Sequence, residues 1–214
     1  MIWLLLLLSC APTSSTVGEA LLQAGSTEAR AEEPAVQPTL LANSDPWTLR
    51  EGATRAGVAW PPPGLALQVV KSTRTLSALS GGTTLKRYRV GLGDPDGAKQ
   101  RQGDRRTPEG KLRIVTRNTR SNFHRFLGIS YPTAADADRG LRAGLITRSQ
   151  ADAIRAAEAA GRAPPWDTPL GGTVGIHGGG GEVDWTLGCI AVTDAEIDEL
   201  FEVVHVGTPL SVLP

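Results

Sequence analysis

The sequence predicts a mostly β fold with a helical insertion, and three observations support this prediction. From residue 65 onward, short segments alternate apolar with polar side chains, and residues 85–90 alternate apolar with basic ones, which is typical of strands with one buried face. Glycine and proline separate these segments, as in the turn at Gly81 and Gly82. Before the last third of the chain, only residues 147–161 carry a clear helix pattern, with Thr147 and Gln150 spaced as a capping box.

The amino terminus is expected to be an export signal. Residues 1–10 contain a leucine run from Leu4 to Leu8, which is shorter than the roughly 20 residues of a membrane span but fits the apolar part of a signal peptide. The segment ending in Cys10 resembles a bacterial lipobox, so we expect lipidation of Cys10 and contact with a membrane only through that anchor. Because residues 1–9 contain no Lys or Arg, a cleaved signal without lipid and a short anchor remain open. We therefore expect an exported protein of the periplasm or cell envelope.

Residues 11–63 are expected to form a flexible linker, and residues 64–214 a single domain. The linker is rich in Ala, Pro, Ser, Thr, Glu and Gly, shows no sustained period and ends in three prolines, so it offers too little apolar surface to fold alone. A chain of 214 residues leaves little room for a second core. Within the domain we expect a helix from Thr193 to about Val203 and strands at 65–71, 74–79, 84–91, 111–116, 123–131, 172–177, 189–192 and 208–213.

The overall charge gives no reason to expect nucleic acid as a partner, because 22 basic residues balance 22 acidic ones. Residues 99–125 are nevertheless basic, with nine Lys or Arg against two acidic residues. This segment fits either a groove for carboxylate- or phosphate-bearing envelope polymers or a solvated basic face. The three histidines and the cysteine that remains beside Cys10 form no closely spaced ligand pair, so we expect no metal.

The segment from His177 to Cys189 carries the candidate chemistry. A histidine that ends one strand and a cysteine that begins another, 12 residues later, suit a Cys–His pair facing across a glycine-rich loop. Gly178 and Gly188 leave room for a substrate backbone, and the amides of residues 187–189 are candidates for an oxyanion hole. We expect a nearby imidazolium to lower the pKa of Cys189, so that thiolate prevails at neutral pH. The alternative is a buried cysteine beside a hydrogen-bonded histidine.

These residues resemble the signature of the L,D-transpeptidase catalytic domain of bacterial peptidoglycan enzymes, in which a His-Gly pair is followed by Ser or Thr, one residue, Gly-Cys and a hydrophobic pair. Residues 177–192 match this order, and residues 103–110 and 127–132 resemble the Thr-Pro-Glu-Gly and Gly-Ile-Ser-Tyr-Pro segments of one subgroup. The resemblance covers about residues 65–214. It implies a mixed-sheet β-sandwich with the helical insertion and a short helix after the cysteine.

The resemblance also assigns site residues. Cys189 would be the nucleophile, His177 its base, and the carbonyl near Gly178 the group that orients the imidazole. Many members carry a histidine directly before the Gly-Cys pair, where this chain has leucine, so the acyl acceptor stays open. The residues assigned to the oxyanion hole or to substrate contacts are Gly188, Leu187, Thr186, Arg106, Tyr131 and His124.

The activity implied by this resemblance is acyl transfer on peptidoglycan stem peptides. The Cys189 thiolate would attack the carbonyl between the third, L-centred residue and the terminal D-alanine of a tetrapeptide stem. The thioester would pass to an amine of a neighbouring stem, giving a 3→3 cross-link, to an amine of an envelope protein, or to water, and no cofactor is needed because the thioester conserves the bond energy. The alternatives are a hydrolase of the same fold that trims stems or releases attached proteins, and an inactive peptidoglycan-binding lipoprotein. Papain-like peptidases place Cys before His, so the chain order argues against them.

The remaining polar residues near the motif have two interpretations each. His124 fits a contact in the substrate groove or a structural hydrogen bond, whereas His205 lies in an apolar stretch and is expected to be structural. Glu182 and Asp184 either decorate a solvated loop or tune His177. None of these four residues is assigned to proton transfer.

Overall fold

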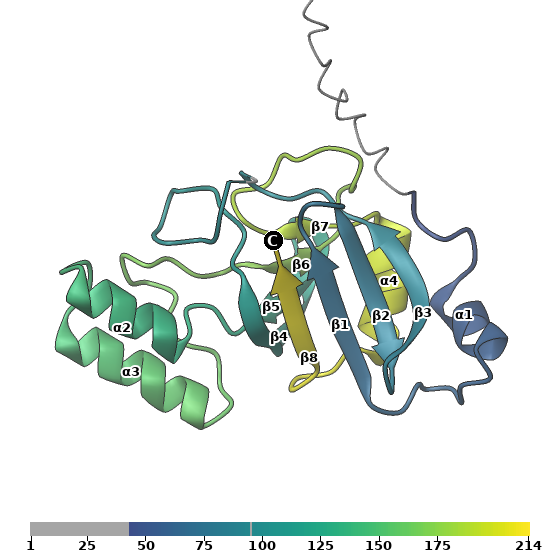
Figure 1. Ribbon diagram of the computed structural model, residues 1–214, viewed down its shortest axis with the longest axis horizontal. Helices are drawn as coiled ribbons and strands as arrows, with labels where there is room; N and C mark the ends of the chain where they lie inside the picture. Colours follow the sequence, from purple (N-terminus) through teal and green to yellow (C-terminus); the bar gives the residue numbers. More distant parts are fainter. Residues whose placement is uncertain (1–42, 95) are drawn as a thin grey trace, which may run out of the picture. The chain divides into compact units, whose positions relative to one another are not determined.

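One curled eight-stranded sheet forms the centre of the computed structural model, which describes residues 43–94 and 96–214 (Figure 1). The predicted signal peptide, Cys10 and the linker up to residue 42 lie outside these residues. Neighbouring strands follow the order β3-β2-β1-β8-β4-β5-β6-β7. The strands are β1 (Leu65–Val70), β2 (Thr75–Ser80), β3 (Thr83–Arg89), β4 (Gly110–Ser121), β5 (His124–Ile129), β6 (Gly175–His177), β7 (Ile190–Ala191) and β8 (Pro209–Leu213). The helices are α1 (Leu49–Arg55), α2 (Ala134–Arg142), α3 (Arg148–Ala159) and α4 (Asp194–Val203).

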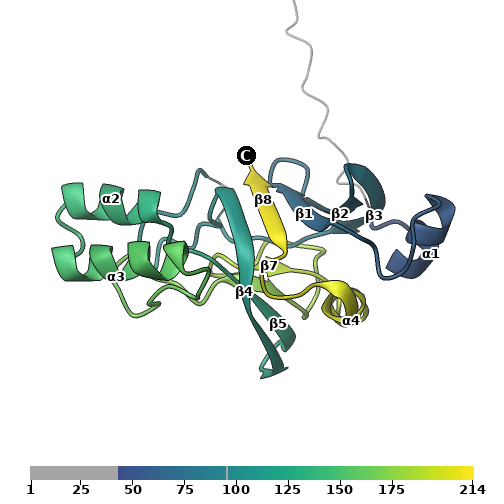
Figure 2. The ribbon, with the colours of Figure 1, turned by 90° about the horizontal axis from the view of Figure 1, so that it is seen from below.

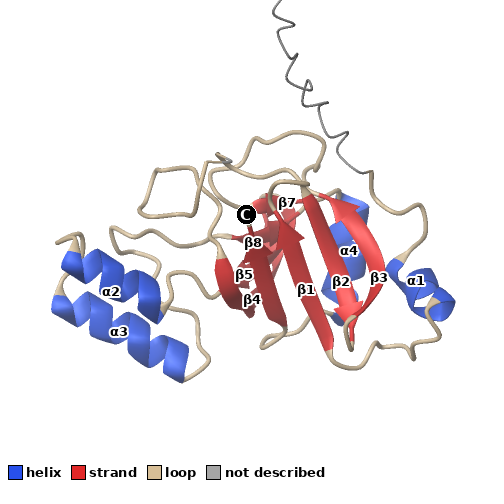
Figure 3. Cartoon of the chain, in the orientation of Figure 1, coloured by secondary structure: helices blue, strands red, loops and turns tan. Residues whose placement is uncertain are grey.

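The sheet is mixed, and its curl brings distant strands together. β1 pairs in parallel with β8, and β6 pairs in parallel with β7, whereas the other neighbours are antiparallel. Just after β3, Gly91 exchanges two backbone hydrogen bonds of 2.9 and 2.7 Å with Ala191 of β7, which joins the two ends of the strand order. The prediction of a mostly β, mixed-sheet fold is confirmed, and the two layers of the sandwich come from one sheet that folds over itself (Figure 3).

The core lies inside the curl of the sheet, where α4 runs behind β2 and β3 in the view of Figure 1 and contacts β5 and β6 (Figures 1 and 2). Ile197, Leu200 and Phe201 of α4 are buried there. Thr193 and Glu196 form the capping box that begins this helix, as the sequence predicts. The helix therefore starts five residues after Cys189 and anchors the chain that leaves the candidate site.

The insertion between β5 and β6 contains two helices rather than the single helix predicted. α3 matches the expected segment, and α2 lies beside it around a separate small core of Ala137, Ile146, Ala151, Ile154 and Leu170 (Figures 1 and 2). Sequence analysis missed α2 because it has nine residues, of which only Ala137 and Gly140 are buried. The signal that the sequence did carry is the capping box of Thr133 and Asp136 at the start of this helix.

The expected linker boundary at residue 63 is wrong, because α1 lies inside the predicted linker. Leu49 and Ala53 of this helix are fully buried in the main core, and the Leu49 amide donates a 3.0 Å hydrogen bond to Glu199 of α4. A helix of seven residues is too short to show a period and gains its stability from tertiary packing. Among the helices of the described residues, none is long and apolar enough to cross a membrane.

Candidate active site

Parallel pairing of β6 with β7 puts His177 and Cys189 on the same face of the sheet. Ile176 pairs with Ile190 and His177 with Ala191, so Cys189 lies one position before β7, across from Gly175. Because side chains alternate between faces along a strand, residues 177 and 189 project to the same side. Both side chains line one cavity of about 400 Å³.

The imidazole of His177 is held in one orientation. Its Nδ1 lies 2.6 Å from the carbonyl oxygen of Gly178 and donates to it, which leaves Nε2 as the basic nitrogen. The ring stacks on Phe123 with centroids 4.6 Å apart, and Trp185 packs edge-on beside both rings, 5.6 Å from His177 and 5.5 Å from Phe123. Gly178 in turn donates a 3.1 Å hydrogen bond to the Phe123 carbonyl. The Gly178 carbonyl and the Phe123 ring therefore fix the orientation of the imidazole.

The Cys189 thiol is half-buried, and its pKa differs from the expectation. Burial raises the pKa of Cys189, opposed by a hydrogen bond from the Gly175 backbone and by the charge of Lys99. Burial also lowers the pKa of His177, opposed by the hydrogen bond to Gly178. Both directions favour a neutral thiol and a neutral imidazole over the expected imidazolium–thiolate pair, because burial disfavours every charged form.

Cys189 stands at the boundary between two cavities. The second cavity has a volume of about 540 Å³ and includes Lys99, Arg105 and the exposed Leu187 in its lining. Among the described residues, three line both cavities: Cys189, Trp166 and Thr173. A substrate can thus extend from the sulfur in two directions. Leu187 lines this wall, and its predicted part in substrate binding stays a prediction.

Two glycines allow the cysteine loop to press against the segment before β4. A Cβ atom at Gly93 would collide with the Arg105 carbonyl, and one at Gly188 would collide with the Arg106 carbonyl. Gly188 also has φ of +123°, a conformation that favours glycine. Any side chain at these positions would push Cys189 away from its place in the wall.

The hydroxyl of Thr186 fixes the backbone beside the cysteine. It donates a 2.8 Å hydrogen bond to the Cys189 carbonyl and accepts a 3.1 Å bond from the Gly188 amide. The Gly188 amide is therefore engaged and is not a free oxyanion donor, contrary to the sequence-based expectation. Thr186 is buried and supports the loop, and its contact with a substrate stays a prediction.

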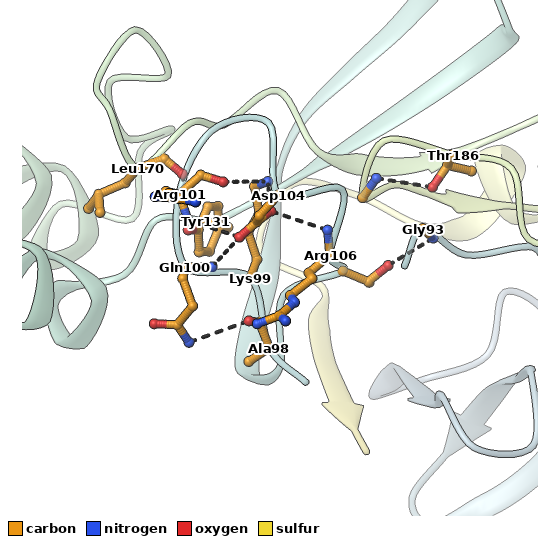
Figure 4. Close-up of polar contacts among 12 residues, drawn as sticks. Gly93, Ala98, Lys99, Gln100, Arg101, Asp104, Arg106, Tyr131, Leu170 and Thr186 are labelled. Atoms are coloured by element: carbon orange, nitrogen blue, oxygen red, sulfur yellow. Dashed lines mark hydrogen bonds and ion pairs between the residues drawn. The ribbon is translucent and has the colours of Figure 1, made fainter. Parts of the chain in front are cut away.

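A buried ion pair flanks the second cavity (Figure 4). The ammonium of Lys99 lies 2.9 Å from a carboxylate oxygen of Asp104. Burial alone would raise the pKa of Asp104, but the Lys99 ammonium and the backbone amides of Gln100, Arg101 and Arg106 lower it. The segment 99–106 is therefore a rigid turn around one carboxylate, and it fixes a cation beside the cavity that contains Cys189.

Three predicted substrate residues do not line either cavity around Cys189. Tyr131 is 1% exposed and donates its hydroxyl hydrogen to the Leu170 carbonyl at 3.1 Å (Figure 4), while Arg106 lines a separate cavity with Arg139. His124 lies 2.8 Å from Asp198, which matches its structural interpretation. Tyr131 and His124 therefore make structural contacts, whereas the Arg106 side chain lines its own cavity. Their roles toward a substrate stay predictions.

The loop carboxylates and His205 also make structural contacts. Asp184 lies 2.7 Å from Arg74 and accepts a 2.9 Å hydrogen bond from the Leu92 amide, and no described contact joins it or Glu182 to His177. His205 lies 3.3 Å from Arg117. Of the two interpretations of Asp184, the structure therefore favours a role in holding the loop.

Sequence analysis missed Trp166, although its indole borders both cavities. The ring nitrogen donates a 2.9 Å hydrogen bond to the Tyr131 carbonyl. A Cβ atom at Gly172 would collide with the indole, so this glycine makes room for it. The only local signal is a tryptophan after two prolines in the connection that follows the insertion, and nothing in that pattern indicates the site.

Within residues 43–94 and 96–214, no three metal-ligating side chains lie together.

Comparison with known proteins identifies a family. The family model of the L,D-transpeptidase catalytic domain, YkuD, matches residues 65–212, and no curated protein matches the chain. Similar solved structures include an L,D-transpeptidase from Xylanimonas cellulosilytica, with 14% identity and a TM-score of 0.43 over 76% of this chain and 68% of that one. An L,D-transpeptidase from Mycobacterium smegmatis shares 11% identity, with a TM-score of 0.43 over 72% and 60%. The helical cell shape determining protein Pgp2 from Campylobacter jejuni shares 18% identity, with a TM-score of 0.46 over 69% and 46%.

Proposed function

The chain belongs to the L,D-transpeptidase catalytic-domain family, and from this premise we propose that it is a peptidoglycan L,D-transpeptidase with Cys189 as nucleophile and His177 as base. The observation that carries the proposal is the shared cavity: the thiol and an imidazole with a free Nε2 line the same space. A sealed cysteine or a histidine bonded at both nitrogens would have no such chemistry.

The first step forms a thioester. As the sulfur attacks the carbonyl carbon between the third, L-centred residue and the terminal D-alanine of a tetrapeptide stem, Nε2 of His177 takes the thiol proton and a C–S bond forms. The Cys189 amide is our candidate donor to the oxyanion, since the Gly188 amide is engaged with Thr186. The C–N bond then breaks, and His177 returns the proton to the departing amine of D-alanine.

The second step transfers the acyl group. An amine attacks the thioester carbon, its proton passes to His177, and the C–S bond breaks to regenerate the thiol. The amine belongs to a neighbouring stem, giving a 3→3 cross-link, or to an envelope protein. If water takes its place, the protein is a carboxypeptidase or amidase of the same fold. We favour transfer because the half-buried sulfur adjoins two cavities, enough for an acyl donor and a bulky acceptor.

We place this activity in the cell envelope. Residues 1–10 would direct export, and lipidation of Cys10 would tether the domain to a membrane surface through residues 11–42. The stem peptides of peptidoglycan lie outside the cytoplasm, so the proposed substrate requires export. Radiolabelled fatty acid incorporation into the wild type but not into Cys10→Ala tests the anchor.

The decisive experiment measures covalent capture. The purified protein is incubated with tetrapeptide muropeptides, and its intact mass is recorded. We expect a tripeptide thioester adduct on the wild type and none on Cys189→Ala. Muropeptide analysis of the same reaction separates cross-linked dimers from free tripeptides, and hence transfer from hydrolysis. Binding without an adduct or any product would refute catalysis and leave a peptidoglycan-binding role.

A further inference from the structure

The cavity that contains His177 has one unpaired cation, and its position suggests a ligand. We propose that Arg120, near the end of β4, binds the carboxylate of the D-amino acid that leaves when the thioester forms. This inference rests on the proposed function, because it names the subsite for the leaving group of that reaction. It adds a specificity-determining residue for which the sequence offered no motif.

The position of His177 decides which cavity receives the leaving group. The imidazole lines the cavity of about 400 Å³, and it is absent from the lining of the cavity of about 540 Å³. A proton-donating histidine must come within about 2.6–3.2 Å of the departing nitrogen. The amine of the D-amino acid therefore leaves into the cavity that His177 lines.

The geometry of the leaving group then brings its carboxylate into the same cavity. In an α-amino acid the carboxylate carbon is two bonds from the amine nitrogen, too short a distance for the two groups to lie in different cavities. Once desolvated against the wall, this carboxylate requires hydrogen-bond donors or a positive charge. An arginine meets both needs, because its planar guanidinium binds a carboxylate through two parallel hydrogen bonds.

Arg120 is the one formally charged side chain, His177 aside, among the described residues that line this cavity. Its neighbours in the wall include Asn118, Ser121 and Asn122, which are polar but neutral. No ion pair and no side-chain hydrogen bond engages Arg120 within the described part of the chain, although its backbone amide donates to Asn118 at 2.8 Å. The guanidinium is therefore available to a ligand.

The other arginines of the same hairpin are already engaged. Arg117 donates to the Phe201 carbonyl and contacts His205, and Arg125 lies 2.7 Å from Asp198. Both stack over the Phe201 ring, which ties them to α4. Arg113, the fourth arginine of the hairpin, donates to the Glu158 carbonyl at 3.2 Å. Arg120 differs from these three in lining the cavity without a partner among the described contacts, so the hairpin uses three arginines for folding and leaves one for recognition.

The test compares two substrates that differ only at the leaving group. One is a tetrapeptide stem with a free terminal carboxylate, and the other is the same stem with a terminal carboxamide. We expect the wild type to prefer the acid by about tenfold to hundredfold in kcat/KM for thioester formation, since hydrogen bonds to a charged group carry such an effect. Arg120→Gln should lower kcat/KM for the acid, mainly through KM, and leave the amide within about twofold. Arg120→Lys should retain part of the preference.

Arg87→Gln is the matched control, because Arg87 lies on β3, its side chain has no partner among the described contacts, and it lines no cavity near Cys189. It removes the same charge and should keep the wild-type preference. An unchanged acid-to-amide ratio in Arg120→Gln would overturn the proposal. So would equal losses on both substrates, or a collapse of the ratio in Arg105→Gln, which alters the other cavity.

A binding measurement separates failure of this subsite from failure of the proposed function. Cys189→Ala cannot form a thioester, so calorimetric titration of this variant with the acid and the amide reports recognition alone. Preference for the acid that disappears in the Cys189→Ala, Arg120→Gln double variant supports the subsite even if the wild type shows no turnover. Equal affinity for both stems refutes the subsite even if the wild type is active.

Discussion

The two ends of the curled sheet are built differently. At one end, β1, β2 and β3 are six or seven residues long, α1 covers β3, and Lys86 of β3 pairs with Glu199 of α4. At the other end, β6 and β7 have three and two residues, with glycine-rich connections and two cavities at Cys189. The first end buries long rows of apolar side chains, whereas the second places two reactive side chains at the edge of a short parallel pair. Stability and chemistry are therefore assigned to different ends.

The largest effect expected from this division is loss of activity without loss of stability. Cys189→Ala should reduce thioester formation by at least about 10⁴-fold, because removal of a nucleophile removes the covalent route. The free energy of unfolding should change by less than about 1 kcal/mol, since the sulfur is only half-buried. Stopped-flow acylation and urea unfolding measure the two quantities. A large loss of stability in this variant would show that the site end also carries the fold.

The converse change belongs to the β1–β3 end. Leu76→Ala removes a fully buried side chain from β2 and should lower the free energy of unfolding by about 2–5 kcal/mol. The folded fraction should acylate at the wild-type rate, because β2 contributes no residue to the cavities at Cys189. Urea unfolding and single-turnover kinetics at low temperature give both values. A slowed chemical step in the folded protein would contradict the comparison.

Two buried lysines provide a finer test, because each pairs with a carboxylate at a different end. Lys86 lies 2.9 Å from Glu199 against α4, and Lys99 lies 2.9 Å from Asp104 beside the second cavity. Both Lys86→Met and Lys99→Met should destabilise the protein by roughly 1–3 kcal/mol, because a partly buried carboxylate loses its partner. Only Lys99→Met should raise the pKa of Cys189, since Lys99 is the cation that favours its thiolate.

The rate of thiol alkylation against pH distinguishes these two lysine variants. The midpoint should move to higher pH in Lys99→Met and stay in place in Lys86→Met. An equal movement in both variants would mean that general loosening of the fold, and not the charge of Lys99, controls the thiol.

The smallest expected effect concerns pH. Burial lowers the pKa of His177, and the neutral imidazole is the base. The acylation rate should therefore rise with pH through a midpoint below the usual pKa range of histidine, and it should stay constant across neutral pH. Because burial raises the pKa of Cys189, a second rise from free thiolate should appear only in the alkaline range. Single-turnover acylation against pH records this profile. A midpoint above the ordinary histidine range would instead indicate a charged resting pair.

The sequence predicts the His177–Cys189 motif and the helix after it better than it predicts α1 or the role of Tyr131. The spacing of His177 and Cys189, with glycines on both flanks, is a local pattern, and so is the Thr193–Glu196 capping box after it. Pattern analysis could not detect α1, because its burial depends on Glu199 and the sheet, far away in the chain. The Gly-Ile-Ser-Tyr-Pro segment indicates the family but not the role of Tyr131, whose hydroxyl supports the connection at Leu170. Long-range contacts decide such roles, and one sequence does not display them.

Trp166 connects the α2–α3 insertion to the cavities at Cys189, although the two lie far apart in the sequence. The indole follows a helix pair with its own small core, yet it forms a partition between the two spaces on either side of the sulfur. A shift of this partition that widened one compartment would narrow the other. Sequence changes in α2 or α3 that move the Trp166 indole would then change the relative sizes of the two cavities. The strands that carry Cys189 and His177 would stay unaltered.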